Sequence, residues 1–476
     1  MQASMFNLRV PLPERDEVFL MNTLSDAQLV VSSDVAALLD RVTSNGGRPS
    51  LHAEEQEAFD LLWENGFVVH DRESERRALD AYFTRVKSDP TELNITVLTT
   101  LQCNFACDYC YQGDHGDYNT LAEKMSLETC ERVGDWIERE MERQRPKDLV
   151  LTFFGGEPLL NLPVLYRLSE RMWHAATGRG VDLKIKIITN GLLLTEEVVD
   201  RLLPYGLSGI KITLDGDRDT HNRMRPLRGG QGTFDRIIDN IGRVAGRCHI
   251  AIGGNFDESS VDSYPALLDF LRNQAFADKL VKVSFKPIIR GETAPQPKGF
   301  LPLIPVGANG QPVKPLSGSC MSAAGTGTAA PCDTCQFLDD KLAYLREETK
   351  RHGFKTADGV HTGPCHVHMK HAHTIGPEGS LYPCPGFTGE KAMSTGHIDD
   401  RRDRFREATW ERFERLSPWK ECGDCAFIPV CAGGCVTASH TTLGDMNKPT
   451  CHKPSMESAL ISLAHQAASA SIGEVQ

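Results

Sequence analysis

Long hydrophobic runs are missing from this chain of 476 residues. No stretch approaches the roughly 18 apolar residues that a membrane-spanning helix needs, and the start of the chain, MQASMFNLRVPLPERDE, contains no apolar run of signal-peptide length. An excess of positive charge is missing too, since the net charge is −12. Nucleic-acid binding depends on Lys and Arg that neutralise phosphates, so the composition disfavours it. We predict a cytoplasmic protein without a membrane or nucleic-acid partner.

Cysteine is absent before Cys103, although the chain contains 15 cysteines. Three of them lie in the segment TLQCNFACDYCYQG, and most of the others lie between Cys320 and Cys451. Disulfides are uncommon in a reducing compartment, so clustered thiols there indicate metal binding or chemistry. Cys130 and Cys248 stand apart from both groups, and we expect them to be ordinary core or surface residues.

Residues 1–85 are predicted to form a small separate domain. The runs FNLRVPLP and EVFLMNTLS indicate strands, SDVAALLDRV and LHAEEQEAFDLLWENG indicate helices, and FVVHD indicates a further strand. This order is winged-helix-like, but the acidic second helix disfavours DNA reading. We predict a peptide-docking domain, with a lid or a dimerisation segment as the alternative. The charged segment ESERRALDAYFTRVKSDPTE is predicted to be a helix and a linker.

Residues 90–310 alternate between β-branched runs and helical segments. The runs are LNITVLTT, DLVLTFFGG, LKIKIITNG, GIKITLDG, CHIAIGGNF and VKVSFKPII. Strands that alternate with helices predict βαβ units and a parallel sheet. Six units are too few to close an eight-fold barrel. We therefore predict an α/β fold built on a partial, open (β/α)6 TIM-like barrel.

A distinctive motif follows each of the first four predicted strands. The first cysteine group follows the first strand, GGEP the second, TNG the third and LDGD the fourth. Functional groups of parallel α/β sheets lie at the C-terminal ends of the strands, so these motifs should meet on one rim. GGEP offers glycine backbone at close range and a carboxylate, which suits an aminoacyl group whose ammonium needs acceptors.

The first cysteine group has a C-x3-C-x2-C spacing and supplies the thiols of Cys103, Cys107 and Cys110. A structural zinc site uses four protein ligands, and a cubane iron–sulfur cluster has four irons to ligate. Three thiolates in one loop therefore leave one iron open to bind a substrate or cofactor. The alternative is a structural zinc site that a distant histidine completes.

The segments CNFACDYC and GGEP resemble the radical S-adenosylmethionine (SAM) superfamily. The resemblance implies that Cys103, Cys107 and Cys110 hold a [4Fe–4S] cluster whose open iron binds the amino and carboxylate groups of SAM. Cleavage of SAM would release a 5′-deoxyadenosyl radical that abstracts a substrate hydrogen. The implied SAM contacts are Tyr109, Gly155, Gly156, Glu157, Pro158, Asn190, Thr213, Asp215 and Arg225. The last four of these could instead be turn formers or helix caps.

The second cysteine group lies in residues 365–476. It reads Cys365-x13-Gly379-x4-Cys384, then Cys422-x2-Cys425-x5-Cys431-x3-Cys435, then Cys451. The pattern resembles the SPASM extension of radical enzymes that modify peptides, which implies two auxiliary [4Fe–4S] clusters and three clusters in all. The outer cluster would use Cys422, Cys425, Cys431 and Cys451, and the inner cluster Cys365, Cys384 and Cys435. Zinc binding by the C-x2-C-x5-C-x3-C run is the alternative.

Seven cysteines cannot fill two four-thiolate clusters. Cys320, Cys332 or Cys335, in the bridging region 311–364, could supply the eighth ligand, and Cys335 is our candidate. Otherwise one iron stays open, and Cys332 with Cys335 forms a surface pair or a separate metal site. Four histidines also lie beside Cys365, with a spacing that suits one strand face, and they are either surface residues or a source of an iron ligand. They are His366, His368, His371 and His373.

The resemblance covers residues 93–451 and implies a maturase of a ribosomally made peptide. Its partners would be a precursor peptide, whose leader adds a strand to a sheet edge of residues 1–85, and a reductant such as flavodoxin or ferredoxin. Hydrogen abstraction would lead to a cross-link, through a thioether or carbon–carbon bond, or to another oxidative modification.

Two rival functions remain open at this point. Formylglycine formation, as in sulfatase maturation, is disfavoured because relatives with that activity carry Asp after the cysteine that Cys384 matches, and this chain has Pro385. A non-catalytic iron–sulfur electron carrier or redox sensor is a rival of another class. Such a protein would need neither GGEP nor an open iron.

Overall fold

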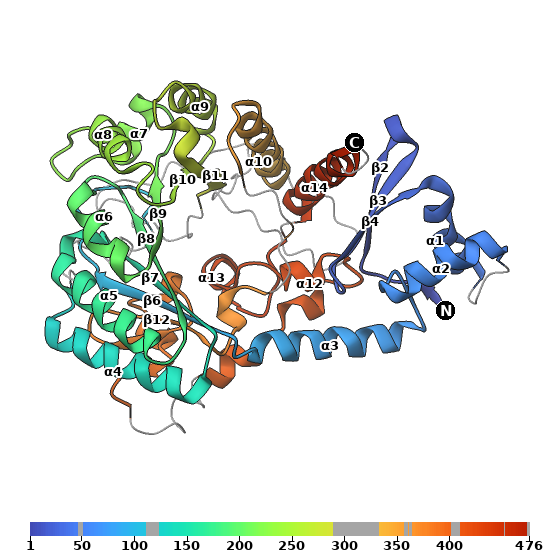
Figure 1. Cartoon of the computed structure of the whole chain (residues 1–476), viewed down its shortest axis with the longest axis horizontal. Coiled ribbons are helices and arrows are strands. Elements are labelled where there is room, and N and C mark those ends of the chain that lie inside the picture. Colours follow the sequence, from blue (N-terminus) through green and yellow to red (C-terminus); the bar gives the residue numbers. More distant parts are fainter. Residues whose placement is uncertain are drawn as a thin grey trace, which may run out of the picture.

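A nine-stranded sheet lies at one end of the molecule, far from the N-terminal strands (Figure 1). Its strand order is β11-β10-β9-β8-β7-β6-β12-β13-β14. The computed structural model describes residues 1–45, 51–110, 123–288, 333–356, 360, 364–400, 410–451 and 453–473. No helix among these residues is both long and apolar enough to span a bilayer.

Six parallel strands make up the barrel part of this sheet. They are β6 (Glu92–Thr100), β7 (Asp148–Gly155), β8 (Asp182–Thr189), β9 (Leu207–Thr213), β10 (Ile250–Phe256) and β11 (Leu280–Pro287). Each pairs in parallel with the next along the chain. The six strands coincide with the six predicted runs, and the partial (β/α)6 barrel is confirmed.

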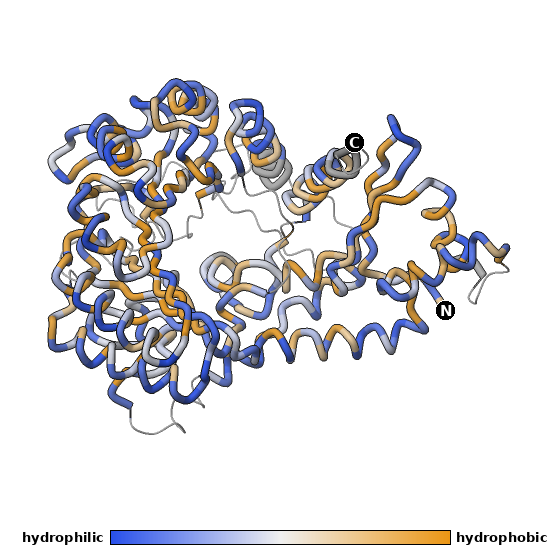
Figure 2. The backbone as a smooth tube through the Cα atoms, in the orientation of Figure 1, coloured by the Kyte–Doolittle hydropathy of each residue, from blue (hydrophilic) through white to orange (hydrophobic). Residues whose placement is uncertain are grey.

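Helices cover the outer face of the barrel strands (Figure 1). They are α4 (Leu127–Gln144), α5 (Leu162–Thr177), α6 (Glu196–Leu202), α7 (Arg218–Met224), α8 (Phe234–Val244) and α9 (Tyr264–Arg272). In α8, Ile237, Ile241 and Val244 recur at helical spacing and are fully buried. They meet the apolar face of the strands, which Figure 2 shows as a hydrophobic band, in one large core cluster. The other face of each strand therefore lines the lumen of the barrel.

The C-terminal region continues the barrel sheet. Strand β12 (Ala372–Ile375) pairs in parallel with β6, and β13 (Ser380–Tyr382) and β14 (Gly396–His397) follow it as antiparallel strands. Helices α10 (Asp333–Arg351) and α14 (Lys453–Gly473) lie side by side. The predicted domain boundaries stay predictions, but the C-terminal region and the barrel share one sheet.

The described residues of the range 1–88 form two small sheets, three α-helices and one 3-10 turn. The elements are β1 (Gln2–Ala3), β2 (Asn7–Leu12), β3 (Glu17–Asn22), β4 (Ala27–Ser32), α1 (Ser33–Asn45), α2 (Ala53–Glu64), β5 (Val68–Val69) and α3 (Arg72–Ser88). Strands β2, β3 and β4 form an antiparallel sheet. The sequence analysis missed β4, which follows a tight turn through Asp26, a residue with a left-handed backbone (φ 62°).

The N-terminal unit packs on the C-terminal region. Helix α3 reaches from one to the other (Figure 1), and its Phe83 ring stacks on Trp419 with 4.0 Å between ring centroids. The Tyr82 hydroxyl donates to the Pro429 carbonyl oxygen at 3.1 Å. On the other side, Phe19 of β3 shares an apolar cluster with residues of α14. These contacts hold β4, an outer strand of its sheet among the described residues, in a fixed place relative to the C-terminal cysteines.

Candidate active site

The first cysteine group lies in the loop that leaves the C-terminal end of β6. Phe105, between Cys103 and Cys107, is fully buried and anchors this loop in the barrel core. The backbone N–H of Ala106 donates to the Pro226 carbonyl oxygen at 2.9 Å, which ties the loop to the segment after α7. The N–H of Phe105 also reaches the Cys103 sulfur, at 3.4 Å.

The thiols of Cys107 and Cys110 lie near enough to Cys103 to affect its ionisation. Burial raises the pKa of Cys103 to about 12, the Phe105 N–H opposes this, and the charges of Cys107 and Cys110 raise it further. Burial also raises the pKa of Cys107, to about 11. Thiols in such surroundings ionise when a metal binds, because the metal takes the thiolate form. Three cysteine donors in one loop fit a cluster that keeps one iron open.

Two glycines of GGEP allow β7 to run against this loop. A Cβ on Gly155 (φ +132°) would lie 2.2 Å from the Thr100 carbonyl oxygen, and a Cβ on Gly156 would lie 2.1 Å from that of Gln102. The N–H groups of Gly156 and Glu157 donate to these two oxygens at 2.9 and 2.8 Å. The motif therefore needs glycine for close backbone approach. GGEP and the cysteine loop are thereby adjacent, as predicted.

The Glu157 carboxylate joins the ends of β7 and β8. It is fully buried and accepts hydrogen bonds from the Thr189 hydroxyl at 2.7 Å and from the N–H groups of Asn190 and Leu159 at 2.8 and 3.0 Å. Burial raises its pKa, and these donors lower it in part. The Asn190 amide in turn donates to Asn104, at 2.7 Å, within the cysteine loop. Pro158 begins a short 3-10 helix after the motif.

A second network ties the cysteine loop to the ends of β9 and β10. The Tyr109 hydroxyl donates to the fully buried Asp215 carboxylate, and Arg225 donates to both. The Asn255 N–H donates to the other carboxylate oxygen at 2.6 Å, and the Asp215 N–H donates to Nδ1 of His221 at 3.1 Å. Thus Tyr109, Asp215 and Arg225 meet on the rim, and their predicted contact with SAM stays a prediction.

Sequence reasoning missed two members of this network. Asn255 ends the fifth strand, and only its place on the rim could have indicated it. His221 lies on α7 and is fully buried, and no motif in the sequence indicated that it would join this network. One donor, Nε of Arg225, is buried without a hydrogen-bond partner among the described residues, which fits a residue that awaits an acceptor from a ligand. Thr213 ends β9 half-buried on the lumen face.

The C-terminal cysteines influence one another's ionisation in two sets, and their predicted roles as cluster ligands stay predictions. Burial raises the pKa of Cys422 to about 12, and the nearby charges of Cys431, Cys425 and Cys451 raise it further. In the other set, burial raises the pKa of Cys384 to about 11, and Cys365 and Cys435 add to the effect. Backbone N–H groups point at two of these sulfurs, from Gly386 to Cys384 at 3.3 Å and from Ala438 to Cys435 at 3.5 Å.

Other predicted ligands are placed differently. Cys320 and Cys332 lie outside the described residues, and Cys335 lies on α10 with its side chain outside them. His366 and His368 lie on a 3-10 helix and His373 on β12, so the prediction of one strand face is wrong. His368 is buried edge-on to Trp419, and burial lowers its pKa to about 4. Within the described ranges, no three Cys, His, Asp or Glu side chains converge as around a single metal ion.

Comparison with known proteins gives both a family and relatives. Residues 97–253 match the Radical SAM superfamily model. The chain is 24% identical over 202 residues to the radical SAM cyclopropyl synthase TigE of Paramaledivibacter caminithermalis, covering 37% of this chain and 41% of TigE. It is 23% identical over 184 residues to the sporulation killing factor maturation protein SkfB of Bacillus subtilis, covering 38% and 40%. The chain thus spans less than half the length of these two relatives.

Two further matches cover more of the chain. The AdoMet-dependent heme synthase of Methanosarcina barkeri is 23% identical over 371 residues, covering 73% of this chain and 91% of that protein. The structure of anSMEcpe with bound AdoMet and Cp18Cys peptide superposes with a TM-score of 0.56 at 16% identity, covering 81% of this chain and 100% of that one. The family model, the motifs and the barrel together show that residues 97–253 form a radical SAM domain, the kind of domain that uses SAM and a [4Fe–4S] cluster.

Proposed function

We propose that the chain is a radical SAM peptide maturase that carries three [4Fe–4S] clusters and forms a cross-link, or another oxidative modification, in a ribosomally made precursor. The observation that carries this proposal is the gathering of the C-terminal cysteines in two sets beside a barrel whose rim bears a third. A maturase of this kind needs an auxiliary cluster that can accept an electron, because hydrogen abstraction followed by bond formation leaves the product two electrons short.

The rim residues would bind and orient SAM. When bound there, the cluster and SAM would supply the radical chemistry that abstracts a hydrogen from the substrate. Cys103, Cys107 and Cys110 would hold the cluster, and GGEP, fixed against the cysteine loop, would present backbone acceptors to the SAM ammonium. The free Nε of Arg225 suits a carboxylate, and Tyr109, which closes the rim network, would help to exclude water.

The N-terminal unit would dock the leader of the precursor. Strand β4 pairs with β3 on one side and, among the described residues, with no strand on the other. Asn22 fixes the turn into β4, because its side-chain oxygen accepts from the N–H groups of Leu24 and Ser25 at 3.0 Å each. A leader could add a strand to this edge.

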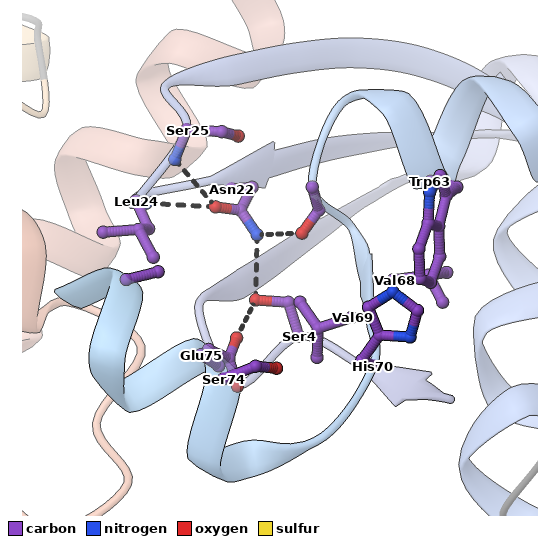
Figure 3. Close-up of a pocket in the computed structure, with 12 residues that line it drawn as sticks. Ser4, Asn22, Leu24, Ser25, Trp63, Val68, Val69, His70, Ser74 and Glu75 are labelled. Atoms are coloured by element: carbon purple, nitrogen blue, oxygen red, sulfur yellow. Dashed lines mark hydrogen bonds between the residues drawn. The ribbon is translucent and has the colours of Figure 1, made fainter. Parts of the chain in front are cut away.

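A pocket below the turn has a hydrogen-bonded floor (Figure 3). There the Asn22 amide donates to the Ser4 hydroxyl and the Gly66 carbonyl oxygen, at 2.9 Å each, and Ser4 donates to the buried Glu75. Trp63 forms part of the pocket wall. These bonds hold the β4 edge in place before any peptide arrives.

Hydrogen exchange tests the docking role. Adding a precursor peptide that the enzyme modifies should slow amide exchange in residues 27–32, because a paired strand protects its partner. Unchanged exchange in β4 on addition of a peptide that the enzyme modifies would rule out docking at this edge.

Two rivals are weighed against the proposal. Formylglycine formation stays disfavoured, since Pro385 follows Cys384 and begins a 3-10 helix there. Modification of a tetrapyrrole is favoured by one observation, which is that the heme synthase alignment covers 91% of that protein. Against it, anSMEcpe shows that a barrel of this fold holds SAM and a peptide together.

The decisive experiment removes the rim cysteines. Anaerobically reconstituted enzyme should hold about twelve irons, by the four-iron stoichiometry of cubane clusters. Replacing Cys103, Cys107 and Cys110 with Ala together should remove about four irons and all formation of 5′-deoxyadenosine from SAM with dithionite. The matched control is Cys248→Ala, which alters an isolated cysteine and should leave both readouts unchanged. A triple variant that still makes 5′-deoxyadenosine, or a wild-type enzyme that never does, would overturn the proposal.

A further inference from the structure

The lumen of the barrel carries lysines on three of its strands. In β9, Ile210 and Ile212 are buried against the helices, so the alternate residue Lys211 points into the lumen. In β11, Val283 is buried against the helices, and its neighbour Lys282 points the other way. Lys286 follows on the same lumen face, and Lys186 of β8 lies on it as well, between the buried Ile185 and Ile187.

The strand register brings three of these lysines together. Ala251 of β10 pairs with Lys211 on one side and with Lys282 on the other, so both lysines flank a small residue at one level. Lys286 pairs with Asn255, whose N–H donates to Asp215 in the rim network. The lysines therefore extend from the middle of the lumen to the rim where SAM is proposed to bind.

The Lys211 side chain passes over Gly253, where the missing Cβ leaves room for it. A Cβ at this position would lie 2.5 Å from Cε of Lys211 and 3.3 Å from its Nζ. The Lys211 side chain therefore crosses over β10 at Gly253, which pairs with Thr213 and Ser284. This places the ammonium one level closer to the rim than its own backbone.

These charges lack the compensation that other barrel lysines have. Lys184, on the same face of β8, is paired with Asp148 at 2.6 Å and Asp182 at 3.2 Å. Among the described residues, Lys211, Lys282 and Lys286 have no ion pair with an acidic side chain. Burial lowers the pKa of Lys211, and the charges of Lys286 and Lys282 lower it further. Lys211 and Lys282 are half-buried and Lys286 is exposed, and such a cluster of cations in a chain of net charge −12 favours an anionic ligand.

We propose that Lys211, Lys282 and Lys286 form a carboxylate-binding site in the barrel lumen, which holds an acidic group of the peptide segment to be modified. The inference deepens the proposed function, on which it rests, by assigning a substrate chemistry: Asp or Glu side chains, or the C-terminal carboxylate, near the residue that loses hydrogen. The ammonium groups would bind the carboxylate through charge-assisted hydrogen bonds.

Binding of synthetic peptides to the full-length holoenzyme tests this site. The first probe is a rhodamine-labelled octapeptide of alternating Gly and Glu with an amidated C-terminus. The second has Gln in place of Glu, and the third is the Gln peptide with a free C-terminal carboxylate. By fluorescence anisotropy at low salt, the Glu probe should bind about tenfold more tightly than the amidated Gln probe, the usual effect of one charged hydrogen bond. The third probe then tells side-chain from terminal carboxylates.

Lysine variants locate the binding in the lumen. Lys211→Gln and Lys286→Gln should each weaken binding of the Glu probe about tenfold and leave the amidated Gln probe unaffected. Lys184→Gln is the matched control, since its charge is already neutralised, and it should bind like the wild type. Lys211→Met should have a thermal midpoint no lower than that of the wild type, because it removes a half-buried charge. Equal affinities for the acidic and amide probes, or wild-type binding by folded Lys211→Gln and Lys286→Gln, would overturn the site.

This result is separable from that of the proposed function. Peptide binding requires no cleavage of SAM, and 5′-deoxyadenosine formation with dithionite requires no peptide. If the enzyme cleaves SAM but binds acidic and amide peptides equally, the lysine site is overturned and the proposed function is kept. If the enzyme binds the Glu probe through Lys211 but never cleaves SAM, the lysine site is kept and the proposed function is overturned.

Discussion

The rim of the barrel and the C-terminal region hold their cysteines in different ways. On the rim, the cysteine loop lies between ends of regular strands, where the Glu157 and Asp215 carboxylates each accept hydrogen bonds from neighbouring strand ends. In the C-terminal region, Cys384 precedes a 3-10 helix (Pro385–Phe387), Cys422 follows another (Pro418–Glu421), and Cys431 ends a single helical turn, α12 (Ile428–Cys431). The rim cysteines are thus positioned by the ends of a sheet, and the C-terminal cysteines by short helical turns.

The supporting cores differ in the same way. The barrel has one large apolar cluster to which all six strands contribute. The C-terminal cysteines border three small clusters, two of which they share with residues of the N-terminal unit. A large core can hold a fold by itself, whereas small cores usually depend on metals or partners. The barrel should therefore fold without its cluster, and the C-terminal region should not.

Removal of iron should give the largest difference between the two regions, by unfolding the C-terminal region and leaving the barrel folded. A structural metal site contributes on the order of 10 kcal/mol to folding. Chelation, or Cys431→Ala, should therefore open the segment 410–451 to proteolysis and fast hydrogen exchange, while peptides from β7 and β8 stay protected. Cys103→Ala is the control and should leave both regions protected. Equal protection of both regions in iron-free protein would contradict the contrast.

Cys384→Ala should separate the two sites functionally. It removes a ligand proposed for the inner cluster and leaves the rim intact, so SAM cleavage should persist while product formation stops after hydrogen abstraction. Mass spectrometry of deuterium-labelled precursor would follow the label into 5′-deoxyadenosine. Normal cross-linked product from a folded variant that has lost this cluster would mean that the cluster is only structural.

Gly156→Ala should damage the rim through the backbone alone. The new Cβ would lie 2.1 Å from the Gln102 carbonyl oxygen, so β7 and the cysteine loop must move apart. We expect a loss of more than about 3 kcal/mol in unfolding free energy and no SAM cleavage. Gly209→Ala is the control, because its Cβ would meet only an ordinary contact at 3.4 Å. A Gly156→Ala enzyme with normal 5′-deoxyadenosine formation would refute the tight fit.

Glu157→Gln should weaken the joint between β7 and β8. The amide keeps the shape, but its NH2 group faces a hydrogen-bond donor where the carboxylate had an acceptor. We expect a loss of about 2 kcal/mol, the usual effect of a mispaired buried group, measured by denaturant unfolding of the isolated enzyme. Exposed Glu258→Gln should cost nothing measurable. An unchanged midpoint for Glu157→Gln would show that the carboxylate is not a structural joint.

The smallest expected effect is the acid sensitivity of the rim. Burial, and then the Arg225 charge, hold the pKa of His221 well below its ordinary value of about 6.5. The unfolded chain binds a proton below about pH 6.5 and the folded chain does not, so stability falls as pH falls, by at most about 1.4 kcal/mol per pH unit. Thermal unfolding between about pH 7.5 and 5.5 should be less pH-dependent in His221→Gln. Parallel curves for both proteins would exclude this role.

The sequence by itself determined the six barrel strands and the four motifs on one rim, and its cysteine spacings predict the division of the C-terminal cysteines. Each depends on local signals, namely alternation, strand-end motifs and fixed cysteine spacings, which need no knowledge of distant partners. The short strand β4 and the turn at Asp26 gave weaker local signals. The prediction that the histidines after Cys365 share one strand face was wrong. Their spacing suits a strand, but the first two of them lie in a 3-10 helix.

Only the tertiary structure decided which distant residues meet. Strand β12 pairs with β6 across more than 270 residues, a register that no local pattern specifies. The Glu157 carboxylate turns to Thr189 and Asn190, and Asn255 completes the Asp215 network, because neighbouring strands bring their ends to the same level. Alternation along β9 places Lys211 on the lumen face. Its position over Gly253 and beside Lys282 follows from the register of β9, β10 and β11 and from the missing Cβ of Gly253. Periodicity decides which face a side chain takes, and only the pairing of strands decides what it faces.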